Sequence, residues 1–144
     1  MTRVGDPFDL ERFVTAQEAA GTYRRAVSEL RRGCKTGHWM WFVFPQLGGL
    51  GKSAISREFA ISSLAEAAAY LGHPLLGPRL IECAGILAET PGRGAAEIFG
   101  LVDAMKLRSS MTLFLRAAPQ EKAFSQVLDR YFDGLADPET DRRI

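Results

Sequence analysis

The stretch HWMWFVFPQLGGLGKS, residues 38–53, decides the fold, because it is either a strand entering a phosphate-binding loop or a buried part of a helical protein. Its last three residues match the end of the Walker pattern G-x-x-x-x-G-K-[ST], but Gln46 stands where the first glycine belongs. That loop also requires a parallel sheet, and residues 39–44 are the only run with strand propensity. We therefore predict a short buried helix or an extended core segment at 39–44. A glycine-rich turn follows, with Ser53 capping a helix from Ala54, and the free N–H groups of such a helix end can hold an anion.

Helical periodicity marks the rest of the chain, because apolar side chains recur at the spacing that places them on one helix face. Asp9 is predicted to cap the first helix, Ser62 or Ser63 to start the helix at 63–71, and His73 to be a turn or capping residue. The pattern predicts an all-α, compact single-domain bundle of about six to eight helices, with an ordered core at 6–134 and a loosely ordered tail at 135–144. The predicted helices cover residues 9–17, 22–32, a segment from 54, 63–71, 75–89, 103–117 and 119–133.

The composition narrows the classes of function. Eighteen basic residues face seventeen acidic ones, a formal net charge of +1 that argues against nucleic-acid binding. No apolar run has the length of a signal peptide core or a membrane span. The two cysteines, Cys34 and Cys83, lack the spacing of zinc ligands, and no metal site or cofactor is predicted. Together these features predict a cytoplasmic protein.

Polar side chains interrupt the apolar stripe of the predicted helix at 103–117. Asp103, Lys106 and Ser110 fall on the same stripe as Phe114. A buried charge is costly unless it is paired or faces a cleft, and a spacing of three residues on the helix lets Asp103 and Lys106 pair with each other. Two interpretations stay open. Asp103 is a helix cap and Lys106 extends to water, or the two form a site in which Lys106 binds an anionic ligand.

Four further residues carry two interpretations each. Gln17 either bonds a neighbouring loop or contacts a ligand, and His38 is the candidate for acid–base chemistry or for a hydrogen bond to a ligand. Trp39 packs in the core or stacks on a ligand ring. Arg79 faces a phosphate or pairs with Glu82.

Four stretches together resemble a bacterial and fungal family of unknown function whose members are sometimes labelled "calpastatin" in genome annotation. They are DPFDLERFVTAQ (6–17), GHWMWFVFPQLGGLG (37–51), AYLGHPLLGPRL (69–80) and IFGLVDAMKLRSSMTLF (98–114). The resemblance implies an all-helical single domain. Calpastatin itself is disordered, whereas this chain is 47% hydrophobic, so inhibition of calpain is rejected.

The layout of an aromatic segment, a Gly-Arg or His-Pro turn and a lysine on a late helix is also similar to the NADAR domain. That resemblance implies chemistry on NAD or ADP-ribose, including cleavage of an N-glycosidic bond. The glutamate-histidine-tyrosine stretch of that domain is absent here, and HWMW at 38–41 is its remote counterpart.

These observations predict a polar cleft that binds a phosphate-bearing nucleotide or an ADP-ribose-like molecule, and an N-glycosidic hydrolase if the protein is an enzyme. Asp103, Lys106 and His38 are the catalytic candidates. Two alternatives stay open: a protein-interaction or regulatory module without enzymatic activity, and a nucleic-acid binder using the arginine pairs at 24–25 and 31–32. The oligomeric state also stays open. The ligand-binding candidates are Trp39, Gln46, Gly48, Gly51, Arg79, Ser110 and Gln17.

Overall fold

The computed structural model describes residues 5–90 and 92–144, and throughout this part of the chain the regular structure is helical, which confirms the all-α prediction. A single isolated parallel bridge joins Leu47 to Ile61, and the described residues contain no strand. The helices are α1 (Glu11–Glu18), η1 (Ala19–Gly21), α2 (Thr22–Arg32), α3 (Met40–Val43), α4 (Ala54–Glu58), α5 (Leu64–Gly72), α6 (Leu76–Glu89), α7 (Ala95–Phe99), α8 (Leu101–Ala117), α9 (Lys122–Phe132) and α10 (Pro138–Arg143).

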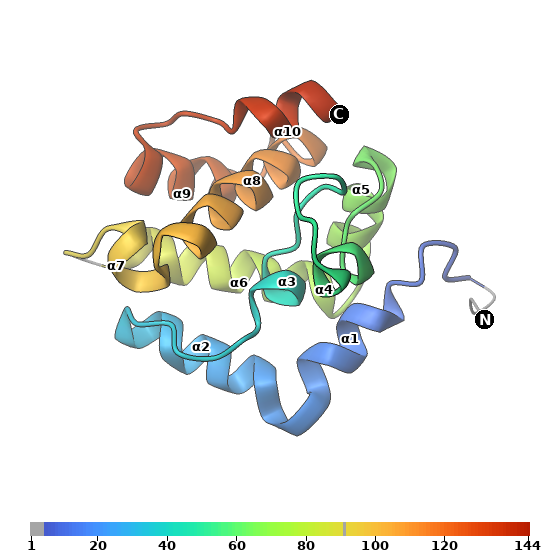
Figure 1. Ribbon diagram of the computed structural model, residues 1–144, viewed down its shortest axis with the longest axis horizontal. Coiled ribbons are helices and arrows are strands. Elements are labelled where there is room, and N and C mark those ends of the chain that lie inside the picture. Colours follow the sequence, from blue (N-terminus) through green and yellow to red (C-terminus); the bar gives the residue numbers. More distant parts are fainter. Residues whose placement is uncertain (1–4, 91) are drawn as a thin grey trace.

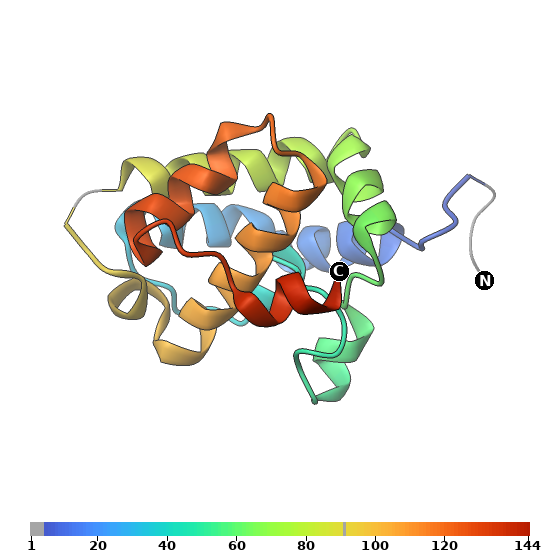
Figure 2. The same cartoon turned by 90° about the horizontal axis from the view of Figure 1, so that it is seen from above.

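Two long helices organise the bundle. Helix α6 packs against α2, α5 and α9, and α8 packs against α5, α7, α9 and α10 (Figure 1). Helix α10, deep red in Figure 2, packs against α8 and crosses it at an angle. The apolar faces meet in one core, in which Phe13, Tyr70 and Phe114 are fully buried. None of the described helices is long and apolar enough to cross a bilayer.

The aromatic stretch after His38 forms one turn of buried helix, α3. Its neighbour Trp39 is 1% exposed, and its ring packs against Phe44 and Phe99. The backbone carbonyl of Trp39 accepts from the amide of Val43, which begins a helical turn instead of a strand. The parallel sheet that a P-loop needs is absent from the part of the chain that the structure describes, so the prediction against a P-loop holds.

Short side chains fix several helix starts as the sequence predicts. The hydroxyl of Ser53 accepts from the amide of Ser56 and caps α4, and Ser63 caps α5 in the same way. His73 is a capping residue, because its Nδ1 accepts from the amides of Leu75 and Leu76 at 3.1 and 3.2 Å.

The first helix begins differently from the prediction. Asp9 was predicted as its cap, but Asp9 has a positive φ of 53° and α1 begins at Glu11. The carboxylate of Asp6 takes the capping role, accepting from the amides of Leu10 and Glu11 at 2.8 and 3.1 Å. A carboxylate five residues upstream can reach these amides only because the chain folds back in a turn at Asp9.

The tail predicted to be loosely ordered at 135–144 instead contains α10. Asp137 caps this helix, and Thr140 is fully buried against the bundle. Arg116 on α8 forms two hydrogen bonds of 2.8 Å with Asp141. Six residues are too few to show helical periodicity, and the stabilising contacts come from α8.

Candidate functional site

A cavity of about 340 Å³ lies between the turn at 46–51, the first half of α8 and the start of α10. We call it the α8 pocket. It brings together three residues predicted as site residues from distant parts of the chain, Gln46, Gly51 and Lys106. The full lining is Gln46, Leu50, Gly51, Val102, Met105, Lys106, Ser109, Asp137 and Glu139.

Lys106 is held at the pocket by an aromatic ring and a carboxylate. Its Nζ lies 4.8 Å from the centre of the Trp41 ring and 3.4 Å from Asp103. Asp103 also forms an ion pair with Lys35, whose Nζ lies 2.8 Å from Oδ2 of the carboxylate. The predicted pair between Asp103 and Lys106 is therefore present, and its two members are three residues apart on the helix.

Asp103 itself does not line the pocket and does not cap α8. The helix begins at Leu101 with Gly100 as its N-cap, so the capping interpretation is wrong. Asp103 instead lies in the first turn, where its negative charge complements the helix dipole.

Ser110 lies one turn further along α8 and is completely buried. Its Oγ has no hydrogen-bond partner within the described chain, and the same is true of the buried Nε1 of Trp41. A buried polar atom without a partner raises the free energy of the native state. Ser110 contributes no group to the lining of the pocket.

The start of α10 supplies polar groups that the sequence prediction missed. Oδ2 of Asp137 accepts from Ser109 Oγ, Thr140 N and Thr140 Oγ1 at 3.0, 3.2 and 2.6 Å. The amide of Asp137 donates to Thr112 at 2.8 Å, so the segment is fixed to α8. The Asp-Pro sequence at 137–138 signals a helix start, but nothing in the sequence places that start beside Lys106.

Basic side chains gather near the turn. A Cβ atom at Gly49 would lie 2.7 Å from Nη1 of Arg143, so the guanidinium rests against the backbone of this turn. Arg143 and Arg142 both pair with Glu139 at 3.2 Å. Lys52 is exposed at the end of the turn.

Three predicted residues near this region lie outside the lining. Trp39 is a core residue, and its indole donates to Glu29 at 3.0 Å, so its ring is not available to stack on a ligand. His38 is exposed. The amide of Gly48 donates to the carbonyl of Ile61 at 2.8 Å and is not free for an anion.

Gln17 and Arg79 lie together at another place in the fold. The amide of Gln17 donates to the carbonyl of Phe42 at 2.7 Å, and its oxygen accepts from Arg79 at 3.1 Å. Arg79 pairs with Glu18 at 2.6 Å instead of the predicted Glu82. Both residues line a cavity of about 290 Å³, but their polar groups are already bonded to other groups of the protein.

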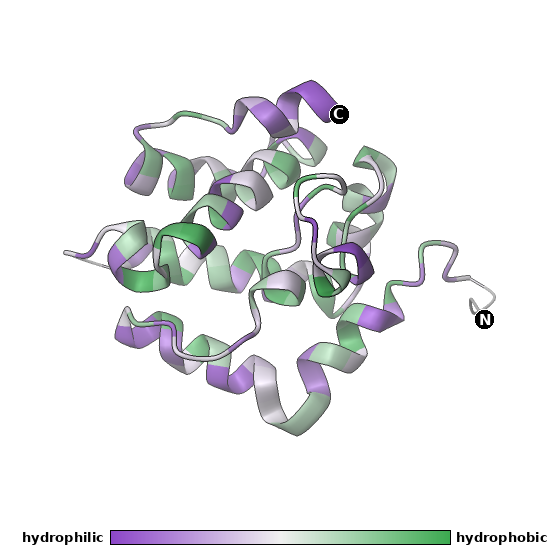
Figure 3. Ribbon diagram, viewed as in Figure 1, coloured by the Kyte–Doolittle hydropathy of each residue, from purple (hydrophilic) through white to green (hydrophobic). Residues whose placement is uncertain are grey.

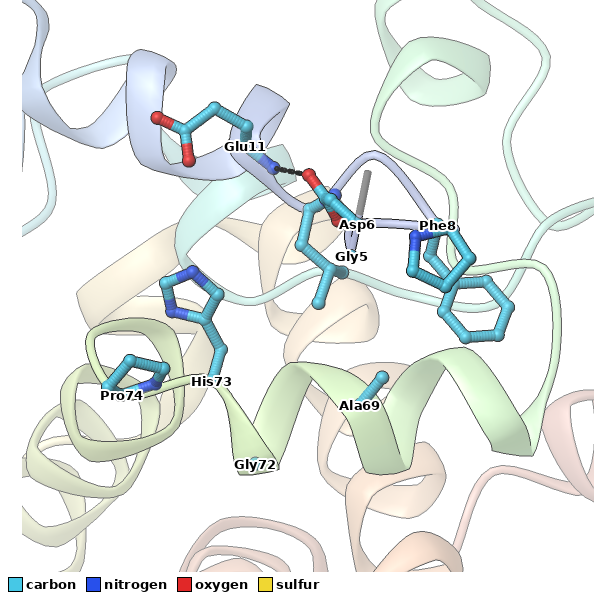
Figure 4. Close-up of a pocket in the computed structure, with 10 residues that line it drawn as sticks. Gly5, Asp6, Phe8, Glu11, Ala69, Gly72, His73 and Pro74 are labelled. Carbon is cyan, nitrogen blue, oxygen red and sulfur yellow. Dashed lines mark hydrogen bonds between the residues drawn. The ribbon is translucent and has the colours of Figure 1, made fainter. Parts of the chain in front are cut away.

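A further cavity of about 370 Å³ separates residues 5–11 from the end of α5 (Figure 4). Two of its polar side chains, those of Asp6 and His73, are committed to helix ends. The carboxylate of Asp6 caps α1, and Nδ1 of His73 caps α6. The other residues drawn in Figure 4 include glycine, proline and apolar side chains, so this cavity offers few free groups for chemistry.

Cys83 is excluded as a nucleophile. Burial raises the pKa of its thiol to about 12, so the thiol stays protonated at neutral pH. Among the residues that the structure describes, no three His, Cys, Asp or Glu side chains gather as a metal site.

Comparison with known proteins agrees with one of the two resemblances. The family model described as "Protein of unknown function (DUF1810)" matches residues 7–144. The crystal structure of the conserved hypothetical protein Rv1873 from Mycobacterium tuberculosis is 55% identical, with a TM-score of 0.92 over 95% of this chain and 96% of that one. No curated protein matches. The similarity to the NADAR domain stays a prediction, whereas the match over nearly the whole chain shows that this protein belongs to the DUF1810 family.

Proposed function

We propose that this protein binds a compact phosphate-bearing nucleotide in the α8 pocket. The observation that carries the proposal is the convergence of Gln46, Gly51 and Lys106 on one cavity, although they come from separate segments. Ligand sites are concave, largely apolar and provided with a few polar groups, as this pocket is.

The size of the cavity favours a small ligand. About 340 Å³ is close to the lower limit of the roughly 300–1,000 Å³ that is typical of small-molecule sites. A mononucleotide is therefore favoured over a complete dinucleotide such as NAD.

The walls offer groups for each part of a nucleotide. Leu50, Val102 and Met105 form an apolar wall suited to the face of a base. The start of α8, where two of them lie, is strongly hydrophobic in Figure 3. Val102 and Met105 are 69% and 72% exposed, so a bound base would cover apolar surface that now faces water.

Cations near the pocket suit the phosphate. Lys106 lines the cavity, and Lys52 and Arg143 lie at the adjoining turn. We assign the phosphate contact to Lys106, because it lines the cavity whereas Lys52 and Arg143 do not.

Hydrolysis of the N-glycosidic bond is the enzymatic extension of this proposal. In that reaction water adds to C1′ of the sugar and the base leaves with a proton, through a transition state with positive charge on the sugar. A carboxylate beside the sugar stabilises that charge. Asp103, the carboxylate among the catalytic candidates, is paired with two lysines and lies outside the lining, and Glu139 is paired with two arginines, so we assign this role to Asp137.

Binding is tested by calorimetry and thermal shift with AMP, ADP, ADP-ribose, NAD and inorganic phosphate. Ligand binding to the native state raises the melting temperature. Lys106→Met should weaken the affinity for the active ligand at least tenfold, because a charged contact to phosphate contributes roughly 1.5–3 kcal/mol. The fold should survive, since Asp103 keeps its ion pair with Lys35.

Lys122→Met is the matched control, because Lys122 is exposed at the start of α9 and makes no ion pair within the described chain. It should bind like the wild type. The proposal would be refuted if no ligand raised the melting temperature or released heat of binding at millimolar concentration. Equal binding by Lys106→Met and the wild type would also refute it. Chromatography of the same samples, which detects any free base that is released, tests the hydrolase extension.

A second function, docking of a protein partner, is favoured by the exposed apolar face at the start of α8. Leu101 is 76% exposed and, unlike Val102 and Met105, does not line the pocket. Exposed apolar patches mark interaction surfaces. Self-association measured by sedimentation and lost in Leu101→Ser would favour docking, whereas the nucleotide proposal expects Leu101→Ser to leave nucleotide affinity unchanged.

A further inference from the structure

Asp137 places an unused hydrogen-bond acceptor at the α8 pocket. Its Oδ2 accepts three hydrogen bonds from Ser109 and Thr140. Its Oδ1 accepts none from any residue that the structure describes, although Asp137 lines the cavity. The side chain cannot turn freely, because these three bonds and the bond from its own amide to Thr112 hold it in place.

The chemistry of this atom restricts the ligand. An ionised carboxylate only accepts hydrogen bonds, so the ligand atom beside it must be a donor. Phosphate oxygens are repelled at this position, and a sugar hydroxyl fits it. Glu139, at the same wall, has one oxygen paired with Arg142 and the other with Arg143, which leaves Oδ1 of Asp137 as the free acceptor on the α10 side.

We propose that Asp137 selects ribonucleotides over 2′-deoxyribonucleotides by accepting a hydrogen bond from the 2′-hydroxyl of the ribose. This inference rests on the proposed function and names the class of nucleotide that the pocket takes. Removing the hydroxyl leaves the carboxylate without its donor, which costs affinity in a site built to bond that group.

The test compares the four ribonucleoside 5′-monophosphates with their 2′-deoxy counterparts by calorimetry. The wild type should bind the best ribonucleotide about tenfold more tightly than its deoxy form, since a hydrogen bond to a charged group contributes roughly 1.5 kcal/mol or more.

Asp137→Asn keeps the cap of α10, because one amide oxygen can replace Oδ2, and presents an NH₂ donor where Oδ1 was. The 2′-hydroxyl can still accept from that NH₂, but only in a neutral hydrogen bond, so the preference for the ribo form should fall from about tenfold to about threefold or less, with the deoxy affinity close to that of the wild type. Asp133→Asn is the control, because Asp133 is exposed at the end of α9 with a φ of 54° that asparagine also adopts. This control should keep the tenfold preference.

The outcomes separate the two levels of the proposal. If ribo and deoxy forms bind the wild type equally, the role of Asp137 is refuted and the pocket remains a nucleotide site. If neither form binds, the proposed function fails and the inference fails with it. If Asp137→Asn does not fold, the preference of the wild type and its reduction in Ser109→Ala, which removes one of the three bonds that hold the carboxylate, decide the question.

Discussion

Glu29 is the residue whose replacement tests most directly how the aromatic segment is held. It lies on α2, is 6% exposed, and its Oε1 accepts from the amides of Thr36 and Gly37 at 2.7 and 2.8 Å. The indole of Trp39 donates to the same oxygen at 3.0 Å. One carboxylate oxygen therefore anchors the loop that leads into α3 and towards the α8 pocket.

The magnitude follows from these three bonds. Glu29→Ala leaves three donors without an acceptor. The buried indole of Trp39 contributes a loss of roughly 1–3 kcal/mol and the two part-buried amides about 0.5–1.5 kcal/mol each, which gives a total loss of about 2–6 kcal/mol. That approaches the whole stability of a small domain, typically about 5–15 kcal/mol. Glu29→Gln keeps an acceptor oxygen but loses the charge, so we expect a smaller loss of about 1–2 kcal/mol.

The effect should also depend on pH. Burial alone raises the pKa of Glu29, but the hydrogen bonds from Gly37, Thr36 and Trp39 outweigh it and hold the pKa below its ordinary value. A lowered pKa in the folded state means that the charge stabilises the protein above the unfolded pKa of about 4.3 and that this stability is lost as pH falls through the folded value. The difference between wild type and Glu29→Gln should therefore be complete at pH 6 and shrink below about pH 4.3.

Urea denaturation followed by circular dichroism and tryptophan fluorescence measures these differences. Glu58→Gln is the control, because Glu58 is exposed and its side chain has no ion pair in the described chain. Changes below about 0.5 kcal/mol in both Glu29 variants, at the level of ordinary surface substitutions, would refute the anchoring role. A difference that grows at low pH would refute the sign of the pKa argument.

Two other pairs of variants test packing by denaturation. Ser110→Ala should be neutral or stabilising, because its buried Oγ has no partner, whereas Thr112→Val should cost about 1–2 kcal/mol, because Thr112 accepts from Asp137 and donates to Arg108. A loss above about 1 kcal/mol in Ser110→Ala would mean that Oγ has a partner, such as a buried water. Gly77→Ala should cost at least about 2 kcal/mol, because its Cβ would lie 2.0 Å from the carbonyl oxygen of Leu71. Gly85→Ala in the same helix meets no atom within 4 Å and should stabilise the protein by about 0.5–1 kcal/mol; equal effects at the two glycines would contradict the packing of α5 on α6.

The sequence by itself determined the helical fold class, since apolar periodicity and the capping side chains of Ser53, Ser63 and His73 are local properties. It also determined that Asp103 and Lys106 pair, because residues three apart on a helix are neighbours. These interactions need only the few residues on either side.

Only the tertiary structure decided which candidates share a cavity. Gln46 and Lys106 meet at the α8 pocket, whereas Gln17 and Arg79 bond to each other elsewhere. For Trp39 the sequence left core packing and ligand stacking open, and the hydrogen bond from its indole to Glu29, ten positions earlier, decides for the core. Asp137 enters the site because α10 packs on α8, a contact that depends on the path of the whole chain and that local pattern does not encode.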